Sequence, residues 1–325
     1  IKTTAEYFPK KDRAFATSIF NAGASVGALI APVTIPPLAA AFGWELAFVI
    51  IGALGFFWMG FWVVMYDKPA KSKHINEEEL AYIRQDEDEP AAEAVEEEKS
   101  SIPFLKCFTY RQTWSFIAGK FFTDSVWWFY LFWAPAYFQD QFGYKASSGM
   151  GMSLIVTLYA IVTVISIFGG YLPKMFVEKK GMHPYNGRML AMLIFAFFPL
   201  FALFAQPMGQ YSAWWPAIII GLAGAGHQAW SANLFSTIGD MFPKSAIATI
   251  TGIGGMAGGI SSFIINLSAG RLFDYSASMG AEFTFLGFEG KEAGYMIVFC
   301  ICAVAYLIAW SIMKALVPKY KKIEE

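Results

Sequence analysis

His227-Gln-Ala-Trp-Ser-Ala-Asn-Leu-Phe-Ser-Thr-Ile-Gly-Asp-Met-Phe-Pro-Lys244 is the stretch of this sequence that decides the fold. Polar side chains stand inside an apolar run, which then ends on an acidic residue followed by Phe-Pro-Lys. A shorter copy of this ending, Glu6-Tyr-Phe-Pro-Lys10, lies 234 residues earlier. Each copy is followed by a Gly-rich apolar run, so the repetition predicts a duplicated architecture.

The composition requires a lipid environment. Of 325 residues, 56% are hydrophobic and only 15% are charged. A soluble domain of this length cannot bury so much apolar surface. A bilayer needs roughly 20 predominantly apolar residues per helix, and runs this long satisfy their backbone in lipid as helices. The sequence therefore predicts an all-α integral membrane protein with eight spans, at about 14–41, 46–66, 114–136, 149–171, 189–205, 214–238, 246–270 and 295–315.

The distribution of Lys and Arg predicts the orientation of these spans. If the first span starts in the cytoplasm, 19 Lys and Arg residues fall in cytoplasmic segments. The other side then holds only Lys145, Arg271 and Lys291. Cytoplasmic loops of membrane proteins carry this excess, so the bias supports both the span count and the direction.

A solvated linker separates the second span from the third. Residues 67–106 contain twelve Asp and Glu residues. Asn76 followed by Glu79 has the form of a helix N-cap with its reciprocal Glu, which predicts a short helix over 77–83. The remainder is expected to be a flexible acidic tether.

The span 114–136 contains a Lys and an Asp at positions that should lie in hydrocarbon. Lys120, Thr123, Asp124 and Trp127 share one helical face, and charges there should face the bundle interior or water. The pair either neutralises itself as an i,i+4 ion pair or lines a polar cavity. In the second case Lys120 meets an anionic substrate group and Trp127 or Trp128 packs on a sugar-like ring. Tyr130 is a further candidate, unless it belongs to an interfacial aromatic belt.

The span 214–238 supplies the second set of candidate binding residues: His227, Gln228, Trp230 and Asn233. Together on adjacent turns, such side chains are suited to line a site for a polyhydroxylated ligand. His227 alone could instead be a hydrogen-bonded packing residue. In the first span, Asn21 is a candidate because an amide inside a bilayer usually faces a partner helix or a water-filled cavity.

Two glycine-rich segments allow more than one interpretation. Gly169-Gly170, followed by basic residues, fits a gating turn between two helices. The basic residues fit equally the ordinary excess of Lys and Arg in cytoplasmic loops. The run 252–259 contains five closely spaced glycines that helix propensity does not favour. It predicts close helix contact or a segment that moves.

Several phrases resemble bacterial hexuronate transporters, which belong to the anion:cation symporter branch of the major facilitator superfamily. They are Glu6-Tyr-Phe-Pro-Lys-Lys-Asp-Arg-Ala, His74-Ile-Asn-Glu-Glu-Glu-Leu, Gly119-Lys-Phe-Phe-Thr-Asp, Trp127-Trp-Phe-Tyr-Leu-Phe-Trp and the stretch 227–244. The resemblance runs over essentially the whole chain. It implies twelve helices in two halves, both termini in the cytoplasm and a substrate cavity between the halves.

On this map the chain holds eight of the twelve helices, and the first three with most of the fourth lie outside this sequence. Residues 1–66 are then the remainder of the N-terminal bundle, 67–113 the acidic cytoplasmic linker and 114–325 the C-terminal six-helix bundle. The resemblance implies a monomer in the bacterial cytoplasmic (inner) membrane, with its C-terminus in the cytoplasm. Its partners are membrane lipid and a small anionic sugar acid, taken up with protons; no cofactor and no nucleic acid are implied.

Three other functions compete with hexuronate symport. The alternative within transport is a related organic anion such as an aldonate. A polytopic membrane enzyme is disfavoured because the spans contain no nucleophile–base constellation and no metal-ligand spacing. Cys107, Cys300 and Cys302 likewise form no framework for disulfides or metal. A membrane sensor would need an effector domain, and the linker is too short to be one.

Overall fold

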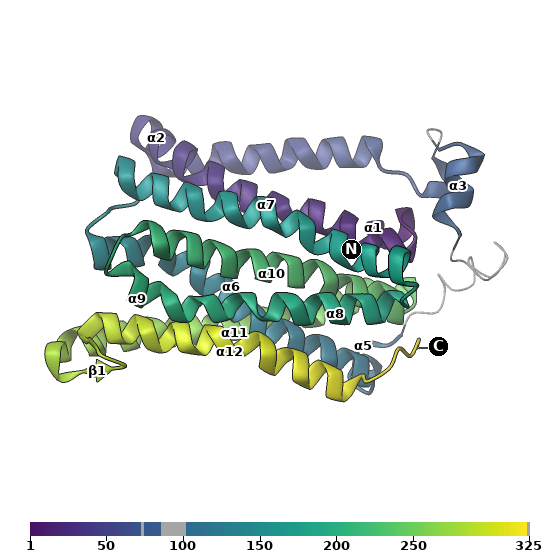
Figure 1. The fold of residues 1–325 in the computed structure, drawn as a ribbon. Coiled ribbons are helices and arrows are strands. Elements are labelled where there is room, and N and C mark those ends of the chain that lie inside the picture. Colours follow the sequence, from purple (N-terminus) through teal and green to yellow (C-terminus); the bar gives the residue numbers. More distant parts are fainter. Residues whose placement is uncertain (73–74, 86–101, 324–325) are drawn as a thin grey trace.

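The structure is a computed structural model that describes residues 1–72, 75–85 and 102–323, and it is built almost entirely of helices (Figure 1). The helices are α1 Lys2–Tyr7, α2 Lys10–Met65, α3 Glu77–Ile83, α5 Phe104–Cys107, α6 Arg111–Phe142, α7 Gly149–Lys180, α8 Pro184–Ala196, α9 Ala205–Gly209, α10 Trp214–Met241, α11 Lys244–Met279 and α12 Gly290–Leu316. Short 3₁₀ turns are η1 Pro69–Lys71, η2 Phe198–Phe204 and η3 Gly280–Glu282. A two-residue hairpin pairs β1 Thr284–Phe285 antiparallel with β2 Phe288–Glu289.

Among the described residues, five helical segments are long and apolar enough to cross a membrane. They are Pro37–Met65, Gly149–Lys180, Pro184–Gly209, Lys244–Glu282 and Gly290–Leu316. The spans predicted at 114–136 and 214–238 coincide with α6 and α10, two further long helices in the same bundle. The total of eight spans stays a prediction.

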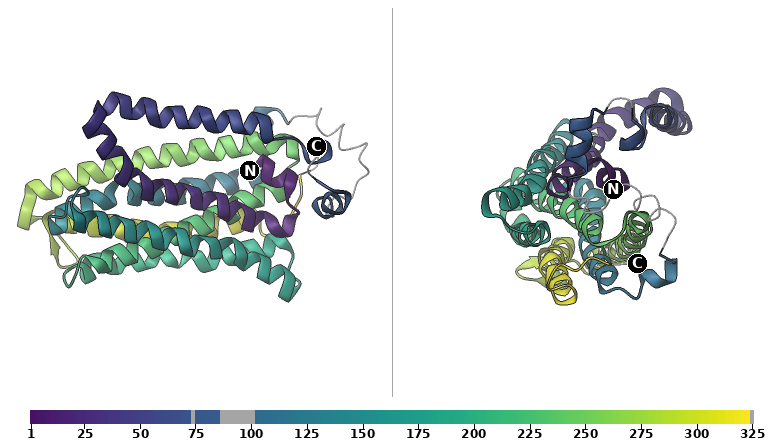
Figure 2. Two further views of the ribbon diagram at one scale, coloured as in Figure 1. Left: turned by 90° about the horizontal axis from the view of Figure 1, so that it is seen from above. Right: turned by 90° about the vertical axis from the view of Figure 1, so that its right-hand side faces the viewer.

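Helix α2 contains both of the first two predicted spans. It bends at Gly43, whose φ of 82° and ψ of 156° lie outside the helical region. Glycine accepts a positive φ because it has no Cβ atom. The segment after the bend lies at the edge of the bundle (Figure 2), and large apolar side chains such as Phe56 and Val64 are exposed on it.

Helix α7 lies between α2 and α10, and two glycines allow this packing. A Cβ atom on Gly169 would lie 2.1 Å from the Cβ atom of Ala229 in α10, and one on Gly170 would lie 2.4 Å from the carbonyl oxygen of Ala14 in α2. Both glycines lie inside α7, so the interpretation of Gly169-Gly170 as a turn is wrong. Small residues at such positions let helix backbones approach closely in a membrane.

The glycine run of α11 also brings helices together. A Cβ atom on Gly254 would lie 2.0 Å from the ring of Phe116, and one on Gly258 would lie 2.2 Å from the carboxylate of Asp124. Both neighbours belong to α6. The prediction of close helix contact is confirmed at these two positions.

The two copies of the Phe-Pro-Lys phrase have the same backbone geometry. Phe8 and Phe242 end α1 and α10 in extended conformation, with φ of −126° and −109°. Pro9 and Pro243 then precede α2 and α11 with nearly identical angles, −63° and 157° against −62° and 151°. The duplication read from the sequence is thus repeated as a helix–break–helix unit.

The start of the linker helix agrees with its sequence signal. α3 spans Glu77–Ile83, and the Asn76 side chain accepts a hydrogen bond of 2.7 Å from the Glu79 backbone N–H. An N-cap of this kind satisfies one of the free N–H groups at a helix start. Residues 86–98 of the predicted acidic tether lie outside the described residues.

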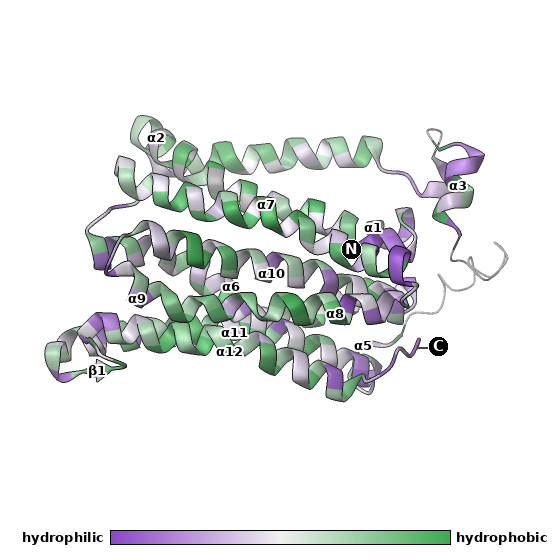
Figure 3. Ribbon diagram, viewed as in Figure 1, coloured by the Kyte–Doolittle hydropathy of each residue, from purple (hydrophilic) through white to green (hydrophobic). Residues whose placement is uncertain are grey.

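The two ends of the bundle differ in character. Both termini, α1, α3 and α5 lie at one end, whereas the hairpin lies at the other (Figure 1). Hydrophilic residues gather toward the ends, while the long helices are mainly hydrophobic along their middles (Figure 3). Near the hairpin end, Lys291 at the start of α12 pairs with Asp140 of α6 at 2.7 Å.

Candidate functional site

A buried ion pair occupies the middle of α6. Lys120 Nζ lies 2.6 Å from Asp124 Oδ2, and both residues are less than a tenth exposed. The ammonium group also lies 4.6 Å from the centre of the Phe235 ring of α10. A buried pair is held well only while both partners are present, because either charge alone would be uncompensated.

Aromatic rings from three helices continue this face. The Trp127 ring of α6 stacks on the imidazole of His227 of α10, with centres 5.2 Å apart and planes 7° from parallel. Tyr306 of α12 places its hydroxyl oxygen 2.6 Å from His227 Nδ1 and donates a 3.2 Å hydrogen bond to the Thr123 carbonyl. If His227 carries its proton on Nδ1, it donates to the Tyr306 hydroxyl oxygen, and the Tyr306 O–H donates to the Thr123 carbonyl.

We call this group the Lys120 cluster: Lys120, Thr123, Asp124, Trp127, His227 and Tyr306. Tyr306 was not predicted from the sequence. It stands alone in the apolar run of α12, far along the chain from α6, where no local pattern marks it. Trp230 packs edge-on against Tyr306 at 5.5 Å, and its buried indole N–H has no partner within the described part of the chain.

The remaining predicted residues lie around or apart from the cluster. The Asn233 side-chain amide donates to the carbonyls of Gly169 and Ala229, at 3.0 and 2.8 Å, so it joins α10 to α7. Gln228 and Tyr130 are buried beside the cluster on α10 and α6. No hydrogen bond or ion pair among the described residues links Asn21 of α2 to it. The assignment of Asn233, Gln228, Tyr130 and Asn21 as substrate-binding residues stays a prediction.

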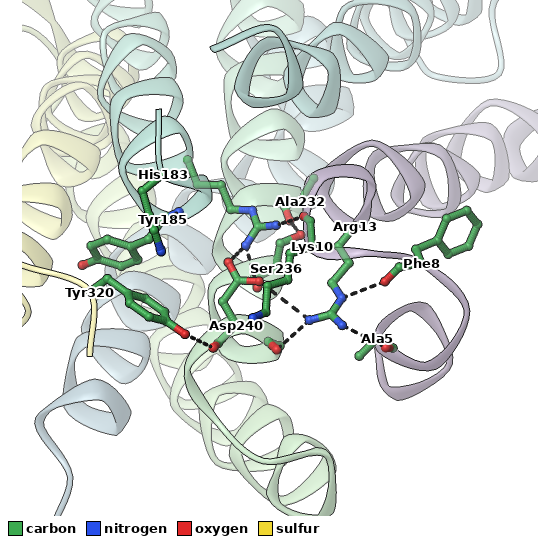
Figure 4. Close-up of polar contacts among 12 residues, drawn as sticks. Ala5, Phe8, Lys10, Arg13, His183, Tyr185, Ala232, Ser236, Asp240 and Tyr320 are labelled. Carbon is green, nitrogen blue, oxygen red and sulfur yellow. Dashed lines mark hydrogen bonds and ion pairs between the residues drawn. The ribbon is translucent and has the colours of Figure 1, made fainter. Parts of the chain in front are cut away.

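A second charged group lies where α10 ends (Figure 4). The Asp240 carboxylate pairs with Arg188 of α8, and its second oxygen lies 3.7 Å from Arg13 Nη1 of α2. Arg188 and Asp240 are only 2% and 4% exposed. Tyr320 of the C-terminal tail donates a 3.0 Å hydrogen bond to the Asp240 carbonyl. We call these four residues the Asp240 cluster.

Backbone carbonyls hold the two arginines in place. Arg13 donates to the carbonyls of Ala5, Phe8 and Gly239 at 3.1, 3.0 and 2.8 Å. Arg188 donates to the Ser236 carbonyl at 3.1 Å. The five donors of a guanidinium group allow one side chain to join several segments in this way.

Sequence reasoning missed the arginines of this cluster. Arg13 and Arg188 were counted as positive-inside residues, and each stands at the start of an apolar run like many other basic residues. The usable signal was Asp240, the acidic residue of the repeated phrase, because a carboxylate at that depth requires a cation.

Neighbouring groups at this end are electrostatically tuned. Burial would raise the pKa of Asp12, but hydrogen bonds from Lys174 and Tyr82 outweigh it and hold the pKa below its usual value. Burial, together with the positive charges of Lys10 and Arg188, lowers the pKa of His183. Neutral His183 accepts a 3.3 Å hydrogen bond from the Tyr185 backbone N–H and so caps α8.

The described residues contain no group of three or more His, Cys, Asp or Glu side chains that could hold a metal ion. The three cysteines are unpaired thiols.

Long apolar helices with charged groups buried between them define a multi-pass membrane protein. The chain belongs to the Major Facilitator Superfamily, whose family profile matches residues 1–265. It is 28% identical to the hexuronate transporter of Escherichia coli K12 over 278 residues, which is 84% of this chain and 62% of that protein. The chain thus spans about three fifths of the length of that relative.

Two further relatives extend the comparison. The galacturonate transporter of Dickeya chrysanthemi is 28% identical over 54% of this chain and 50% of its own length. The vesicular glutamate transporter 2.1 of Danio rerio is 30% identical over 52% of this chain and 29% of its own length. Each of these three relatives is named as a transporter.

Proposed function

We propose that the protein is a proton-coupled symporter that takes up a hexuronate such as glucuronate or galacturonate by alternating access. The observation that carries the proposal is the buried Lys120 cation beside Trp127 and His227, in a chain similar to transporters named for these sugar acids. A charge inside a membrane bundle is costly unless it serves a partner or a substrate.

The Lys120 cluster offers the groups that a sugar acid needs. Lys120 pairs with the cargo carboxylate, and the Trp127 ring packs on the apolar face of the sugar. The unpartnered indole N–H of Trp230 is a donor for a sugar hydroxyl, and the predicted residues Gln228, Asn233, Tyr130 and Asn21 supply further polar groups.

Coupling follows from competition for Lys120. Without cargo, Asp124 neutralises the ammonium group at 2.6 Å. A proton that binds the Asp124 carboxylate breaks this ion pair, and the freed ammonium binds the cargo carboxylate. Cargo and proton then move together, because binding of either one favours binding of the other.

The Asp240 cluster supports alternating access. Arg13 of α2 reaches Asp240 and Gly239 of α10, so the cluster joins the segment before the linker to the segment after it. Opening the bundle at this end must separate Arg13 from α10. The cluster therefore favours the state that is closed there.

The proposed map places eight helices of a twelve-helix major facilitator fold in this chain. Residues 1–66 hold the end of helix 4 and helices 5 and 6, residues 67–113 the linker, and residues 114–325 helices 7 to 12. The uncovered apolar side chains of the second part of α2 are consistent with further helices or lipid against that face. The protein is proposed to act as a monomer in the bacterial inner membrane, with its C-terminus in the cytoplasm.

Uptake of labelled glucuronate tests the proposal directly. Vesicles containing the intact protein are expected to accumulate glucuronate faster with an inward proton gradient than without one. Uptake that is indifferent to the gradient would overturn the coupling. Lys120→Ala should abolish uptake at normal protein abundance, whereas the exposed loop variant Lys145→Ala should leave it unchanged. Low abundance of Lys120→Ala alone would instead indicate a structural role.

The second candidate is transport of a related organic anion, such as an aldonate. The similarity to a vesicular glutamate transporter favours it, because glutamate shares the carboxylate with hexuronates but has no sugar ring. Competition of labelled glucuronate uptake by a panel of sugar acids separates the two. Stronger competition by an open-chain aldonate than by galacturonate would replace the leading proposal.

A further inference from the structure

A basic groove lies between the start of α6 and the C-terminal tail, at the end of the bundle where both termini lie (Figure 1). Its volume is about 1030 Å³, and its charged lining consists of Arg111, Lys319, Lys321 and Lys322. No acidic side chain lines the groove, and none of these four cations forms an ion pair within the described ranges. Among the described residues, the groove therefore presents four positive charges without an ion-pair partner.

The tail that forms one wall of this groove is fixed to the bundle. The Gln112 side-chain amide donates to the Lys321 carbonyl at 3.2 Å. The Ile323 backbone N–H donates to the Met241 carbonyl at 2.8 Å, and the Ile323 side chain is buried. The segment that carries the three lysines is thus held to the bundle at Lys321 and at Ile323.

An apolar groove continues from the basic one along the bundle. It has a volume of about 420 Å³ and lies between α6 and α12, lined by Trp114, Ile117, Phe121, Ile312 and Leu316 among others. Leu316 lines both grooves. From Arg111 to Phe121 the helix rises about 15 Å, which is half of the roughly 30 Å thickness of the hydrocarbon core of a bilayer.

We propose that these two grooves together bind one anionic phospholipid. The headgroup phosphate occupies the basic groove, and an acyl chain follows the apolar groove between α6 and α12. Cationic pockets between helices attract anionic headgroups, and a lipid presents its charge and its apolar chain in the same order as the two grooves. An acidic peptide would match the lysines but would leave the apolar groove unused.

Lipid binding to the intact purified protein tests this proposal. Native mass spectrometry should show bound phosphatidylglycerol in preference to phosphatidylcholine. Replacing Lys319, Lys321 and Lys322 together by Gln should reduce that preference by about fivefold per lysine, because one basic residue near an anionic surface contributes about 1 kcal/mol. Ile312→Trp should reduce occupancy by filling the apolar groove while leaving the lysines in place.

The matched control replaces Lys71, Lys179 and Lys180 by Gln, which removes three exposed charges at the ends of η1 and α7 instead. It should keep the wild-type preference. An equal loss in this control would show general surface attraction and overturn the site, as would an unchanged preference in the groove variant. If phosphatidylglycerol binds only after the acidic stretch 86–98 is neutralised, that stretch is the occupant and the proposal fails.

Discussion

The two copies of the Phe-Pro-Lys phrase have the same backbone but different partners. Asp240 is buried and pairs with Arg13 and Arg188. Glu6, its counterpart, lies 3.9 Å from the half-exposed Lys2 and accepts a 2.5 Å hydrogen bond from Tyr66. One copy thus holds a buried charge network, and the other holds a partly solvated contact.

The residue seven positions after each acid explains the asymmetry. Arg13 follows Glu6 at that distance, whereas the buried Ile247 follows Asp240. The arginine of the first copy therefore reaches the acid of the second, but the second copy has no arginine to return. The duplicated unit therefore makes one contact between the segments on either side of the linker, from Arg13 of the first copy to Asp240 of the second.

The largest effect is expected from removing Arg188. Arg188→Leu leaves Asp240 buried with only the more distant Arg13, and breaking a buried pair costs about 3–5 kcal/mol. Thermal unfolding of the intact protein in detergent should shift strongly to lower temperature. The double variant Arg188→Leu with Asp240→Leu should recover part of the loss, because no lone charge remains. A double variant less stable than the single one would contradict this account of the pair.

Removing Arg13 should have a smaller effect on stability and a larger one on opening. Arg13→Ala loses three hydrogen bonds to carbonyls, but two of them are only part-buried, so water can replace them and the loss should stay below the roughly 3–5 kcal/mol of a broken buried pair. Opening can be measured with a cysteine introduced at the buried Thr17 of α2, in a protein without its three native cysteines. This cysteine should react with a maleimide about tenfold faster in the Arg13→Ala variant than in the protein with Arg13 intact. Arg13→Lys is the matched control, and its reaction rate should lie between those of the Arg13→Ala variant and the protein with Arg13 intact. Equal rates in all three proteins would show that Arg13 does not hold this end closed.

Changing the acid of the first copy should matter least among the substitutions. Glu6→Gln removes an ion pair with an exposed lysine, and such surface pairs contribute about 0–1 kcal/mol. The glutamine oxygen can still accept the hydrogen bond from Tyr66. The unfolding temperature should stay close to that of the wild type. A shift as large as that of Arg188→Leu would remove the distinction between the two copies.

A mild pH effect is expected beside the Asp240 cluster. The pKa of His183 is lower in the folded protein than its ordinary value of 6.5, so the folded state favours neutral His183. The resulting stability is fully present above pH 6.5 and is lost as the pH falls from there through the folded pKa. The wild type should therefore lose stability relative to His183→Gln between pH 6.5 and pH 5. A constant difference between the two proteins would exclude His183 as the titrating group.

The sequence predicted those parts of the fold that depend on local chemistry. The Asn76 cap, the repeated phrase and the position of α6 and α10 follow from residues close together in the chain. The bend at Gly43 and the packing of Gly169-Gly170 did not, because the same glycines suit a turn, a bend or a close helix contact. For Gly169-Gly170, only the opposing residues Ala229 and Ala14 decide among these, and they are far away in sequence.

The same limit applies to the sites. The spacing of Lys120 and Asp124 predicted a shared face, and the structure places Trp127 and His227 on it with a stacked geometry. Tyr306 and Arg188 were missed because their partners come from other helices. A buried arginine and a positive-inside arginine have the same local sequence context.

The central claim is that Lys120 holds the cargo carboxylate, and the affinity of the protein for glucuronate tests this claim most directly. Calorimetric titration of the intact, purified protein is expected to show binding that weakens about 10- to 100-fold in Lys120→Gln, since charged hydrogen bonds contribute about 1.5–3 kcal/mol. Thermal unfolding of the same sample should show that the variant remains folded. Folded Lys120→Gln protein that binds glucuronate with wild-type affinity would contradict the account.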